Sequence, residues 1–170
     1  MQPVHVSMIW AMTPNRVIGQ GGGMPWRIPR DMKWFRKQTL GQAVVMGRGT
    51  LASWGGKPLK DRFNIVLTSD RSWRREGVEV VDSVSAALAL CQERKFFDLI
   101  VIGGAEIYKS FLPLAERLYV TLVWSETEGD RHFPHYDERQ WRVVWQEDRW
   151  RQGPKDSHPT RFIWYEEIKR

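Results

Sequence analysis

Apolar residues occur along the chain in short blocks, separated by glycine, proline and polar residues, and these blocks predict alternating strands and helices. Four blocks are largely apolar and too short for helices, which is typical of buried strands: 4–12, 43–46, 63–68 and 98–102. Further strands are predicted over 78–81 and 117–124. Segments 141–150 and 160–168 alternate between apolar and polar positions, which indicates an antiparallel pair joined by residues 152–156.

Four helices are predicted between these strands, beginning at Pro29, after Gly47, after Asp82 or Ser83, and at Ala105. No internal repeat or low-complexity tract interrupts the pattern. The alternation predicts one α/β domain over residues 1–170. Its central sheet of about eight strands is mostly parallel, with an antiparallel C-terminal hairpin and about four flanking helices.

Composition adds few restrictions to this picture. The net charge of +6 suits an anionic ligand, but the basic residues are dispersed rather than clustered as in a nucleic-acid-binding protein. No apolar run is long enough to span a bilayer, residues 1–5 do not resemble a leader, and Cys91 is the single cysteine, so we expect a cytoplasmic protein. The four histidines show no metal-binding spacing, and no metal is expected. The ten tryptophans are expected mostly in the core or lining a cleft.

The segment 24–35 is the strongest candidate for chemistry. Pro29 suits a first helical turn, and Asp31 suits the positive end of the helix dipole. The spacing of Asp31, Met32 and Phe35 places a carboxylate beside an apolar wall, where a charge is expensive unless it binds or protonates something. The residues alone leave open that Asp31 faces water as a simple dipole partner.

Glycines and small polar residues mark the ends of several predicted strands. A strand runs into Gly47-Arg48-Gly49-Thr50 and another into Gly103-Gly104, and each presents backbone N–H groups at a helix start, as phosphate sites do. The polar residues 68–71 follow a third strand and indicate either a ligand site or a polar turn. Residues 16–23 contain four glycines and indicate either a mobile loop over a site or a slack surface connection.

These motifs follow an order that is familiar from one family. They are Ile9-Trp10-Ala11, Asn15-Arg16-Val17-Ile18-Gly19, Met24-Pro25-Trp26-x-x-Pro29-x-Asp31, Thr39-Leu40-Gly41, Val45-Met46-Gly47-Arg48-x-Thr50, Pro58-Leu59-x-x-Arg62-x-Asn64, Ile102-Gly103-Gly104-x-x-Ile107-Tyr108, Leu118-Tyr119-x-Thr121 and Glu128-Gly129-Asp130-x-x-Phe133-Pro134. In this order and spacing the chain resembles dihydrofolate reductase of the bacterial chromosomal type along essentially its whole length. The resemblance implies an NADPH-dependent oxidoreductase of one-carbon metabolism, an antifolate target, that makes tetrahydrofolate in the cytoplasm as a monomer.

The resemblance also implies roles for individual residues. Asp31 would accept two hydrogen bonds from the pterin, Thr121 would bond the same carboxylate or an adjacent water, and Trp26 would hold that water. The proton would reach the pterin through solvent. Arg62 would grip the glutamate tail of the substrate, although the residue alone reads as an exposed arginine at a strand start. The implied substrate-binding residues are Ile9, Ala11, Asp31, Met32, Phe35, Ser53, Trp54, Leu59, Arg62, Ile102, Tyr108 and Thr121.

NADPH would bind through two helix starts and the loop after the strand 63–68. Ala11 and Ile18 would contact the nicotinamide, and Thr68, Ser69 and Arg71 would hold the 2′-phosphate. The Gly103–Gly104 bond is expected to be cis, as in the family. The implied cofactor-binding residues are Ala11, Ile18, Gly19, Met24, Gly47, Arg48, Gly49, Thr50, Leu67, Thr68, Ser69, Arg71, Ile102, Gly103, Gly104, Ala105, Glu106, Ile107 and Tyr108.

The chain departs from the family pattern at three places. Glycines 21–23 replace more polar loop residues, which predicts a more mobile loop. Gly49 replaces a larger residue beside the phosphates, and Trp54 replaces an aliphatic one, so sensitivity to antifolates does not carry over. Two alternatives are a related pyrimidine reductase of riboflavin synthesis and a basic nucleic-acid-binding module. The segment 24–31 and Arg62 disfavour the first, and the dispersed charge disfavours the second.

Overall fold

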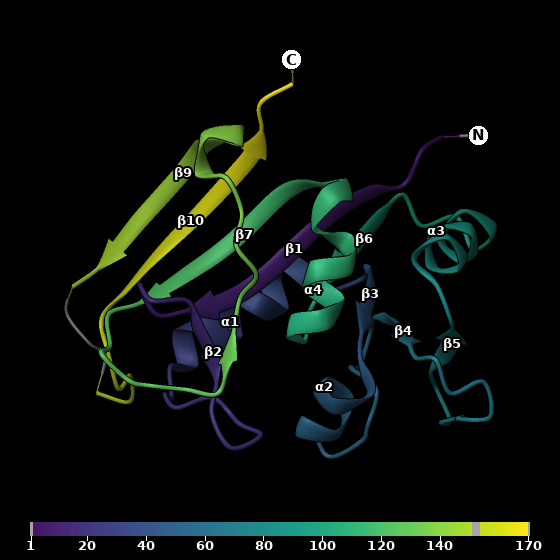
Figure 1. Ribbon diagram of the computed structural model, residues 1–170, viewed down its shortest axis with the longest axis horizontal. Helices are drawn as coiled ribbons and strands as arrows, with labels where there is room; N and C mark the ends of the chain where they lie inside the picture. The colour runs from purple at the N-terminus through teal and green to yellow at the C-terminus, as the bar shows by residue number, and fades with distance from the viewer. Residues whose placement is uncertain (1, 151–153, 170) are drawn as a thin grey trace. The chain divides into compact units, whose positions relative to one another are not determined.

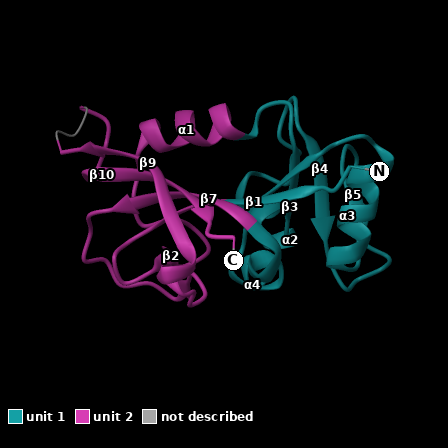
Figure 2. Ribbon diagram, turned by 90° about the horizontal axis from the view of Figure 1, so that it is seen from above, with its two compact units in different colours: residues 1–8, 39–115 teal, residues 9–38, 116–170 magenta. Residues whose placement is uncertain are grey.

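A computed structural model describes residues 2–150 and 154–169. The chain divides into two compact units, which Figure 2 shows in teal and magenta. Unit 1 contains residues 1–8 and 39–115, and unit 2 contains residues 9–38 and 116–170. No helix within the described residues is long and apolar enough to cross a membrane.

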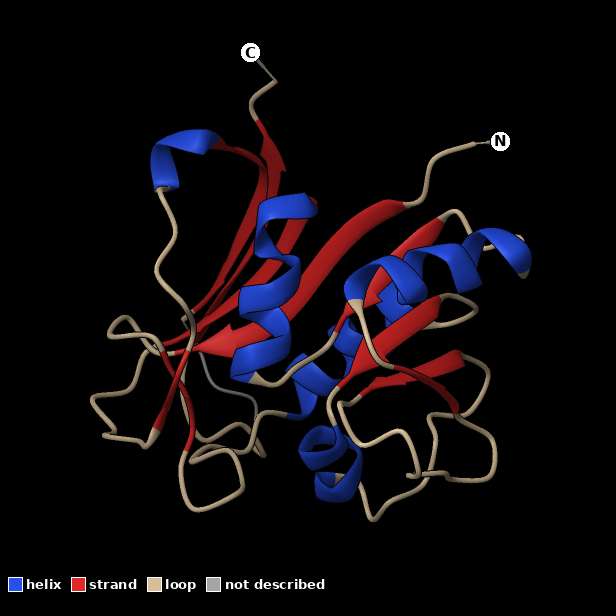
Figure 3. Ribbon diagram, turned by 45° about the vertical axis from the view of Figure 1, so that its right-hand side comes forward, coloured by secondary structure: helices blue, strands red, loops and turns tan. Residues whose placement is uncertain are grey.

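Unit 1 alternates strands with helices (Figures 1 and 3). Its strands are β3 (Ala43–Met46), β4 (Phe63–Leu67), β5 (Glu79–Val81) and β6 (Asp98–Val101), together with the first half of β1 (His5–Met12). Its helices are α2 (Arg48–Ser53), α3 (Val84–Glu93) and α4 (Ala105–Phe111), followed by the 3₁₀ turn η1 (Leu112–Leu114). Helix α3 packs on β4, β5 and β6, and its start is capped by the Ser83 side chain, which accepts from the Ala86 N–H.

Unit 2 is built mainly from strands around one helix. It contains the second half of β1, then β2 (Val17–Gly19), α1 (Pro29–Thr39, of which Thr39 falls in unit 1), β7 (Ala115–Val123, of which Ala115 falls in unit 1), β8 (Arg131–His132), the 3₁₀ turn η2 (Glu138–Gln140), β9 (Trp141–Arg149) and β10 (Thr160–Glu167). Figure 2 shows α1 running alongside β9 and β10. The contact is aromatic. The Trp34 ring of α1 stacks on the Trp145 ring of β9, with 5.4 Å between centroids, and its centroid lies 5.3 Å from that of Phe162 on β10.

The strands form one eight-stranded sheet in the order β5-β4-β3-β6-β1-β7-β10-β9. The pairs from β5 to β1 are parallel, and β10 pairs antiparallel with both β7 and β9. β3 and β6 are buried along almost their whole length, as expected for parallel strands covered on both faces. The predicted fold class is therefore confirmed. The predicted connection 152–156 lies partly outside the described residues.

The sequence missed a second, two-stranded sheet. Val17–Gly19 was predicted as part of an irregular loop, but it pairs antiparallel with Arg131–His132. Arg16 supports this pair, because its N–H groups contact the Phe133 carbonyl and its own carbonyl accepts from the Phe133 N–H at 2.8 Å. Two strands this short carry no detectable periodicity, so only the tertiary pairing reveals them.

Fewer tryptophans lie in the core than the sequence suggested, and Trp124 lines a hollow instead. Only Trp10 and Trp26 are buried, and Trp145 and Trp150 are exposed. The remaining six are half-buried: Trp34, Trp54, Trp73, Trp124, Trp141 and Trp164. Two of these, Trp141 and Trp164, lie on β9 and β10, where the sheet ends and one side of the outer strand is open.

The glycine-rich loop is a tight turn. Gln20 and Gly23 exchange backbone hydrogen bonds of 2.8 and 3.1 Å around Gly21 and Gly22, which both have positive φ, 59° and 83°. A two-residue hairpin turn of this kind requires positive φ at both central positions. Glycine at 21 and 22 therefore stabilises the turn. This effect opposes the prediction that three glycines make the loop more mobile.

We expect Gly22→Ala to lower the free energy of unfolding by about 1 kcal/mol, because alanine is strained at positive φ. Gly23→Ala is the matched control: Gly23 does not have positive φ, and a Cβ there would meet nothing within 4 Å. Urea denaturation of both variants measures the difference. Equal stability of the two variants would contradict the turn assignment.

Candidate functional site

The candidate site in unit 2 centres on Asp31, in the first turn of α1. The Thr121 hydroxyl, on β7, donates to Asp31 Oδ1 at 2.7 Å, and the Asp31 N–H donates to the Ile28 carbonyl at 3.0 Å. Thr121 is almost fully buried. Trp34, three residues after Asp31, fastens this helix to the sheet through the aromatic contacts described above. Asp31 is thus half-buried and hydrogen-bonded to β7 rather than a fully exposed dipole partner.

Burial raises the pKa of Asp31 from 3.8 to about 6, because a charged carboxylate loses solvation there, and the Thr121 hydrogen bond opposes this by lowering the pKa. The carboxyl group consequently titrates close to neutral pH. Such a group can hold or release a proton under physiological conditions, which an exposed aspartate cannot do.

Apolar residues of the same unit accompany Asp31. Ala11, Trp26, Ile28 and Val123 form one buried cluster, and Ile9 is buried on the same strand as Ala11. The buried indole nitrogen of Trp26 has no hydrogen-bond partner among the described residues. The predicted residues Phe35, which is half-buried, and Met32, which is 49% exposed, follow Asp31 on α1.

The predicted cofactor residues of unit 2 lie on and after β2. Gly19 is buried, Ile18 is half-buried and Met24 is 51% exposed. The turn that follows β2 is held by Asp130, whose Oδ2 accepts from the Gly21 N–H at 3.2 Å. Sequence reasoning gave Asp130 only as part of a motif and assigned it no role.

Unit 1 contains the predicted phosphate residues, and its two glycine-containing strand ends meet. The Gly47 N–H donates to the Gly103 carbonyl at 2.9 Å, and the Gly103–Gly104 bond is cis, as the resemblance implied. A Cβ on Gly103 would lie 3.3 Å from Thr50 Oγ1 and 3.4 Å from Tyr108 Oη. Glycine is favoured in this cradle because Gly103 has a φ of 125° and a Cβ would be tightly placed against both side chains.

The other predicted residues around this cradle are Ile102, just after β6, and residues in the first turns of α2 and α4. A Cβ on Gly49 would meet nothing within 4 Å, so the space beside it is open. Ile102, Ile107 and Tyr108 are buried, whereas Glu106 is exposed. Ala105 is half-buried. The residues present therefore fit a ligand that contacts backbone groups and carries phosphates.

Basic side chains lie close to the loop that follows β4. Arg48 forms an ion pair with Asp70 at 3.6 Å and places its guanidinium 5.5 Å from the Trp73 ring centroid. Arg71 forms an ion pair with Asp82 at 3.1 Å. The predicted residues Leu67 and Thr68 are half-buried and Ser69 is exposed. Sequence reasoning missed Asp70, Trp73 and Asp82, because their nearness to the arginines is tertiary.

The predicted substrate residues of unit 1 lie from the end of α2 to the start of β4, except Ile102 and Tyr108, which follow β6. Arg62 is half-buried and held in place: its Nε donates to Thr39 Oγ1 at 3.2 Å and its Nη1 donates to the Lys60 carbonyl at 2.8 Å. Arg62 is therefore half-buried rather than exposed, and its role toward the glutamate tail stays a prediction. The Leu59 N–H donates to Asn64 Oδ1 at 2.9 Å, and the Ser53 hydroxyl donates to the Thr50 carbonyl at 2.6 Å. Trp54 is half-buried at the end of α2.

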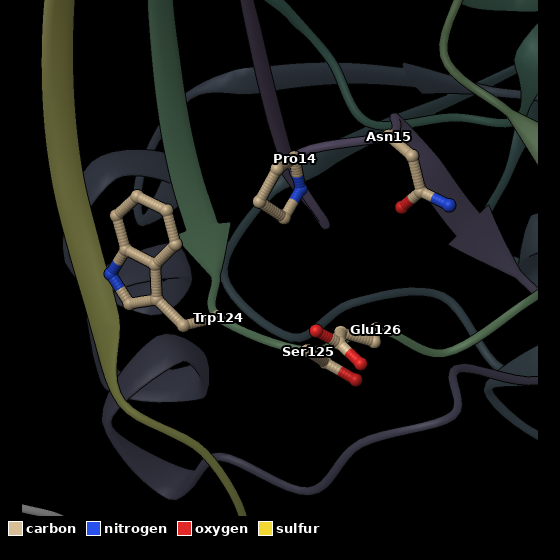
Figure 4. Close-up of a pocket in the computed structure, with 5 residues that line it drawn as sticks. All are labelled: Pro14, Asn15, Trp124, Ser125 and Glu126. Carbon is tan, nitrogen blue, oxygen red and sulfur yellow. The ribbon is translucent and has the colours of Figure 1, made fainter.

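A hollow of about 520 Å³ lies elsewhere in unit 2. Figure 4 shows its lining residues, which follow β1 and β7: Pro14, Asn15, Trp124, Ser125 and Glu126. None of them belongs to the predicted site. Within residues 2–150 and 154–169, no three His, Cys, Asp or Glu side chains are grouped to hold a metal ion.

Comparison with known proteins gives a consistent result. The dihydrofolate reductase family model matches residues 5–167. The chain is 42% identical over 164 residues to the dihydrofolate reductase of Bacillus subtilis, covering 95% of this chain and 94% of that protein. It is 40% identical over 157 residues to the dihydrofolate reductase of Haemophilus influenzae, covering 92% of this chain and 95% of that protein. Dihydrofolate reductase from Enterococcus faecalis, solved in complex with NADP(H) and RAB-propyl, superimposes with a TM-score of 0.90 at 32% identity, covering 97% of each chain.

We expect Thr121→Val to raise the pKa of Asp31 further above 6, by about one pH unit, because the variant loses the hydrogen bond that favours the carboxylate. Thr121→Ser keeps the hydroxyl and should leave the pKa near its wild-type value. Carbon-13 NMR titration of the Asp31 carboxyl measures both. A lower pKa in the valine variant would contradict the hydrogen-bond geometry.

The raised pKa also means that Asp31 lowers the free energy of unfolding at neutral pH. Between pH 3.8 and about 6 the folded protein binds more protons at Asp31 than the unfolded chain does, so this group's contribution to stability falls as the pH rises through that window. We expect Asp31→Asn to raise the free energy of unfolding by about 2–3 kcal/mol at pH 7.5 and by well under about 1 kcal/mol at pH 4. Urea denaturation at both pH values tests this, and a pH-independent difference would contradict it.

Proposed function

The chain belongs to the dihydrofolate reductase family, and from this membership and the geometry above we propose that it reduces 7,8-dihydrofolate to 5,6,7,8-tetrahydrofolate with NADPH. The observation that carries the proposal is the half-buried Asp31 carboxyl, hydrogen-bonded to Thr121, with a pKa near neutrality. NADPH, when bound, supplies the hydride. The chain's own residues bind and orient the reactants and manage one proton.

We assign three residues to the pterin. Asp31 accepts two parallel hydrogen bonds from the amino and ring N–H groups, for which two carboxylate oxygens are needed. Thr121 holds the Asp31 carboxyl in orientation. The unpartnered Trp26 indole nitrogen is available to a water that delivers the proton to the ring through solvent. Ile9, Ala11, Met32 and Phe35 supply apolar contact.

We assign the remaining substrate contacts to unit 1. Arg62 binds the α-carboxylate of the glutamate tail with its guanidinium, and its hydrogen bonds to Thr39 and Lys60 hold it in position for this. Ser53, Trp54, Leu59, Ile102 and Tyr108 contact the rest of the substrate.

The cofactor assignment rests on the glycine cradle and the arginines. The backbone at Gly47–Thr50 and at Gly103–Ile107 receives the pyrophosphate, and Thr68, Ser69 and Arg71, with Arg48 beside them, receive the 2′-phosphate. Ala11, Ile18, Gly19 and Met24 contact the nicotinamide side. Leu67, Ile102 and Tyr108 complete the set.

We further propose that residues 1–170 act as one domain, as a monomer, in the cytoplasm, with no nucleic-acid or membrane partner. The pyrimidine reductase alternative is disfavoured because its substrate has no glutamate tail to require the held guanidinium of Arg62. A nucleic-acid-binding module would have no use for a carboxyl group tuned to neutral pH at Asp31.

We expect NADPH oxidation that depends on dihydrofolate, and a loss of at least about a hundredfold in Asp31→Asn at pH 7, because an amide offers one acceptor oxygen where the pterin needs two and does not titrate near neutral pH. In the wild type, kcat/KM should fall above about pH 6, as the protonated fraction of Asp31 decreases. The loss of NADPH absorbance measures both, and Glu93→Gln, an exposed position on α3, is the control. Full activity in Asp31→Asn would remove Asp31 from its role.

A further inference from the structure

Each of the two arginines assigned to the 2′-phosphate pairs with a carboxylate that is not part of that assignment. Arg48 Nη1 lies 3.6 Å from Asp70 Oδ2, and Arg71 Nη2 lies 3.1 Å from Asp82 Oδ2. Both arginines therefore face a carboxylate, and the four side chains together have a formal charge of zero. A subsite that favours a phosphate of about two negative charges would ordinarily be positive.

Asp70 is held firmly beside Arg48. Its Oδ1 accepts from the Ser72 N–H at 3.0 Å and from the Ser72 hydroxyl at 2.7 Å, and its own N–H donates to Thr68 Oγ1 at 3.2 Å. The hydrogen bonds from Ser72 hold the pKa of Asp70 below its usual value, so the carboxylate is charged at neutral pH. It cannot turn away from an incoming anion without losing these bonds.

Arg48 is positioned to bind an anion next to that fixed charge. Its guanidinium rests over the Trp73 ring, and its 3.6 Å separation from Asp70 is an ion pair too long for a hydrogen bond. Asp70 thus lowers the local positive potential by its charge, while Trp73 keeps the guanidinium in place.

We propose that Asp70 is a specificity-determining residue that weakens the preference of this chain for 2′-phosphorylated over unphosphorylated adenine dinucleotides. The proposal rests on the proposed function, since it concerns the same cofactor subsite. Its consequence is that the chain uses NADH more readily than its arginines alone would allow.

The test uses adenosine 2′,5′-bisphosphate and adenosine 5′-monophosphate, which differ only in the 2′-phosphate, with affinities measured by calorimetry at low salt. Asp70→Asn removes the charge and keeps an oxygen that accepts from the Ser72 N–H. We expect it to bind the bisphosphate roughly three- to tenfold more tightly, with the monophosphate unchanged within about twofold. The gain should shrink near 0.5 M salt, because the shorter Debye length screens the repulsion between the Asp70 carboxylate and the 2′-phosphate.

Two further variants sharpen the result. Asp70→Ser also removes the charge, can still accept from the Ser72 N–H, and must give the same gain. Glu79→Gln is the matched control, because the Glu79 side chain is 44% exposed, like that of Asp70, and also pairs with an arginine, Arg94, at 3.1 Å. Glu79 lies at the start of β5, whereas Asp82 follows the end of that strand. It should change neither affinity.

An unchanged or weaker bisphosphate affinity in Asp70→Asn, or an equal gain in Glu79→Gln, would overturn the proposal. The ratio of kcat/KM with NADPH to that with NADH should rise in Asp70→Asn by the same factor as the affinity. A wild type that reduces dihydrofolate while Asp70→Asn shows no gain defeats this inference alone. A wild type that oxidises no NADPH with dihydrofolate, while the bisphosphate gain is present, defeats the proposed function alone.

Discussion

The hydrogen bond between Thr121 and Asp31 opposes the desolvation of a carboxyl group among apolar residues, and the candidate chemistry depends on that opposition. Burial without this hydrogen bond would raise the pKa of the carboxyl group further, while solvent exposure would leave a permanent carboxylate at neutral pH. The single hydroxyl from β7 keeps the pKa near 6. This bond requires helix α1 to keep its position on the sheet. The contacts of Trp34 with Trp145 and Phe162 hold the helix there.

Much of the fold could be predicted because its signals are local. Short apolar runs and a Ser83 cap are properties of neighbouring residues, and the strands and the third helix appeared close to their predicted bounds. The pair β2–β8 could not be predicted in this way, since its two partners are over a hundred residues apart and only two or three residues long. The tryptophans misled for another reason: a large apolar side chain can also sit on the half-covered strands at the end of a sheet.

The site residues likewise separate into those with a local sequence signal and those that only tertiary contacts reveal. Asp31 could be singled out from its helix start and apolar neighbours, but its partner Thr121, ninety positions away, came only from the family resemblance. Arg62 looked unremarkable in the sequence, and only its hydrogen bonds to Thr39 and Lys60 distinguish it from an ordinary surface arginine. The carboxylates facing Arg48 and Arg71 had no sequence signal, because ion pairing across loops follows no spacing rule.

The outermost strand of the sheet has a consequence for how the protein behaves at high concentration. β9 presents Val143, Val144 and Trp145 to solvent, and an exposed apolar edge is a template for intermolecular strand pairing. The register shift opposite Trp164 and Tyr165 disturbs the flatness of that edge, and charged side chains on the same strand, including Arg142 and Asp148, interrupt it. Loss of these charges by mutation would therefore favour pairing of β9 between molecules and lower the solubility of the protein.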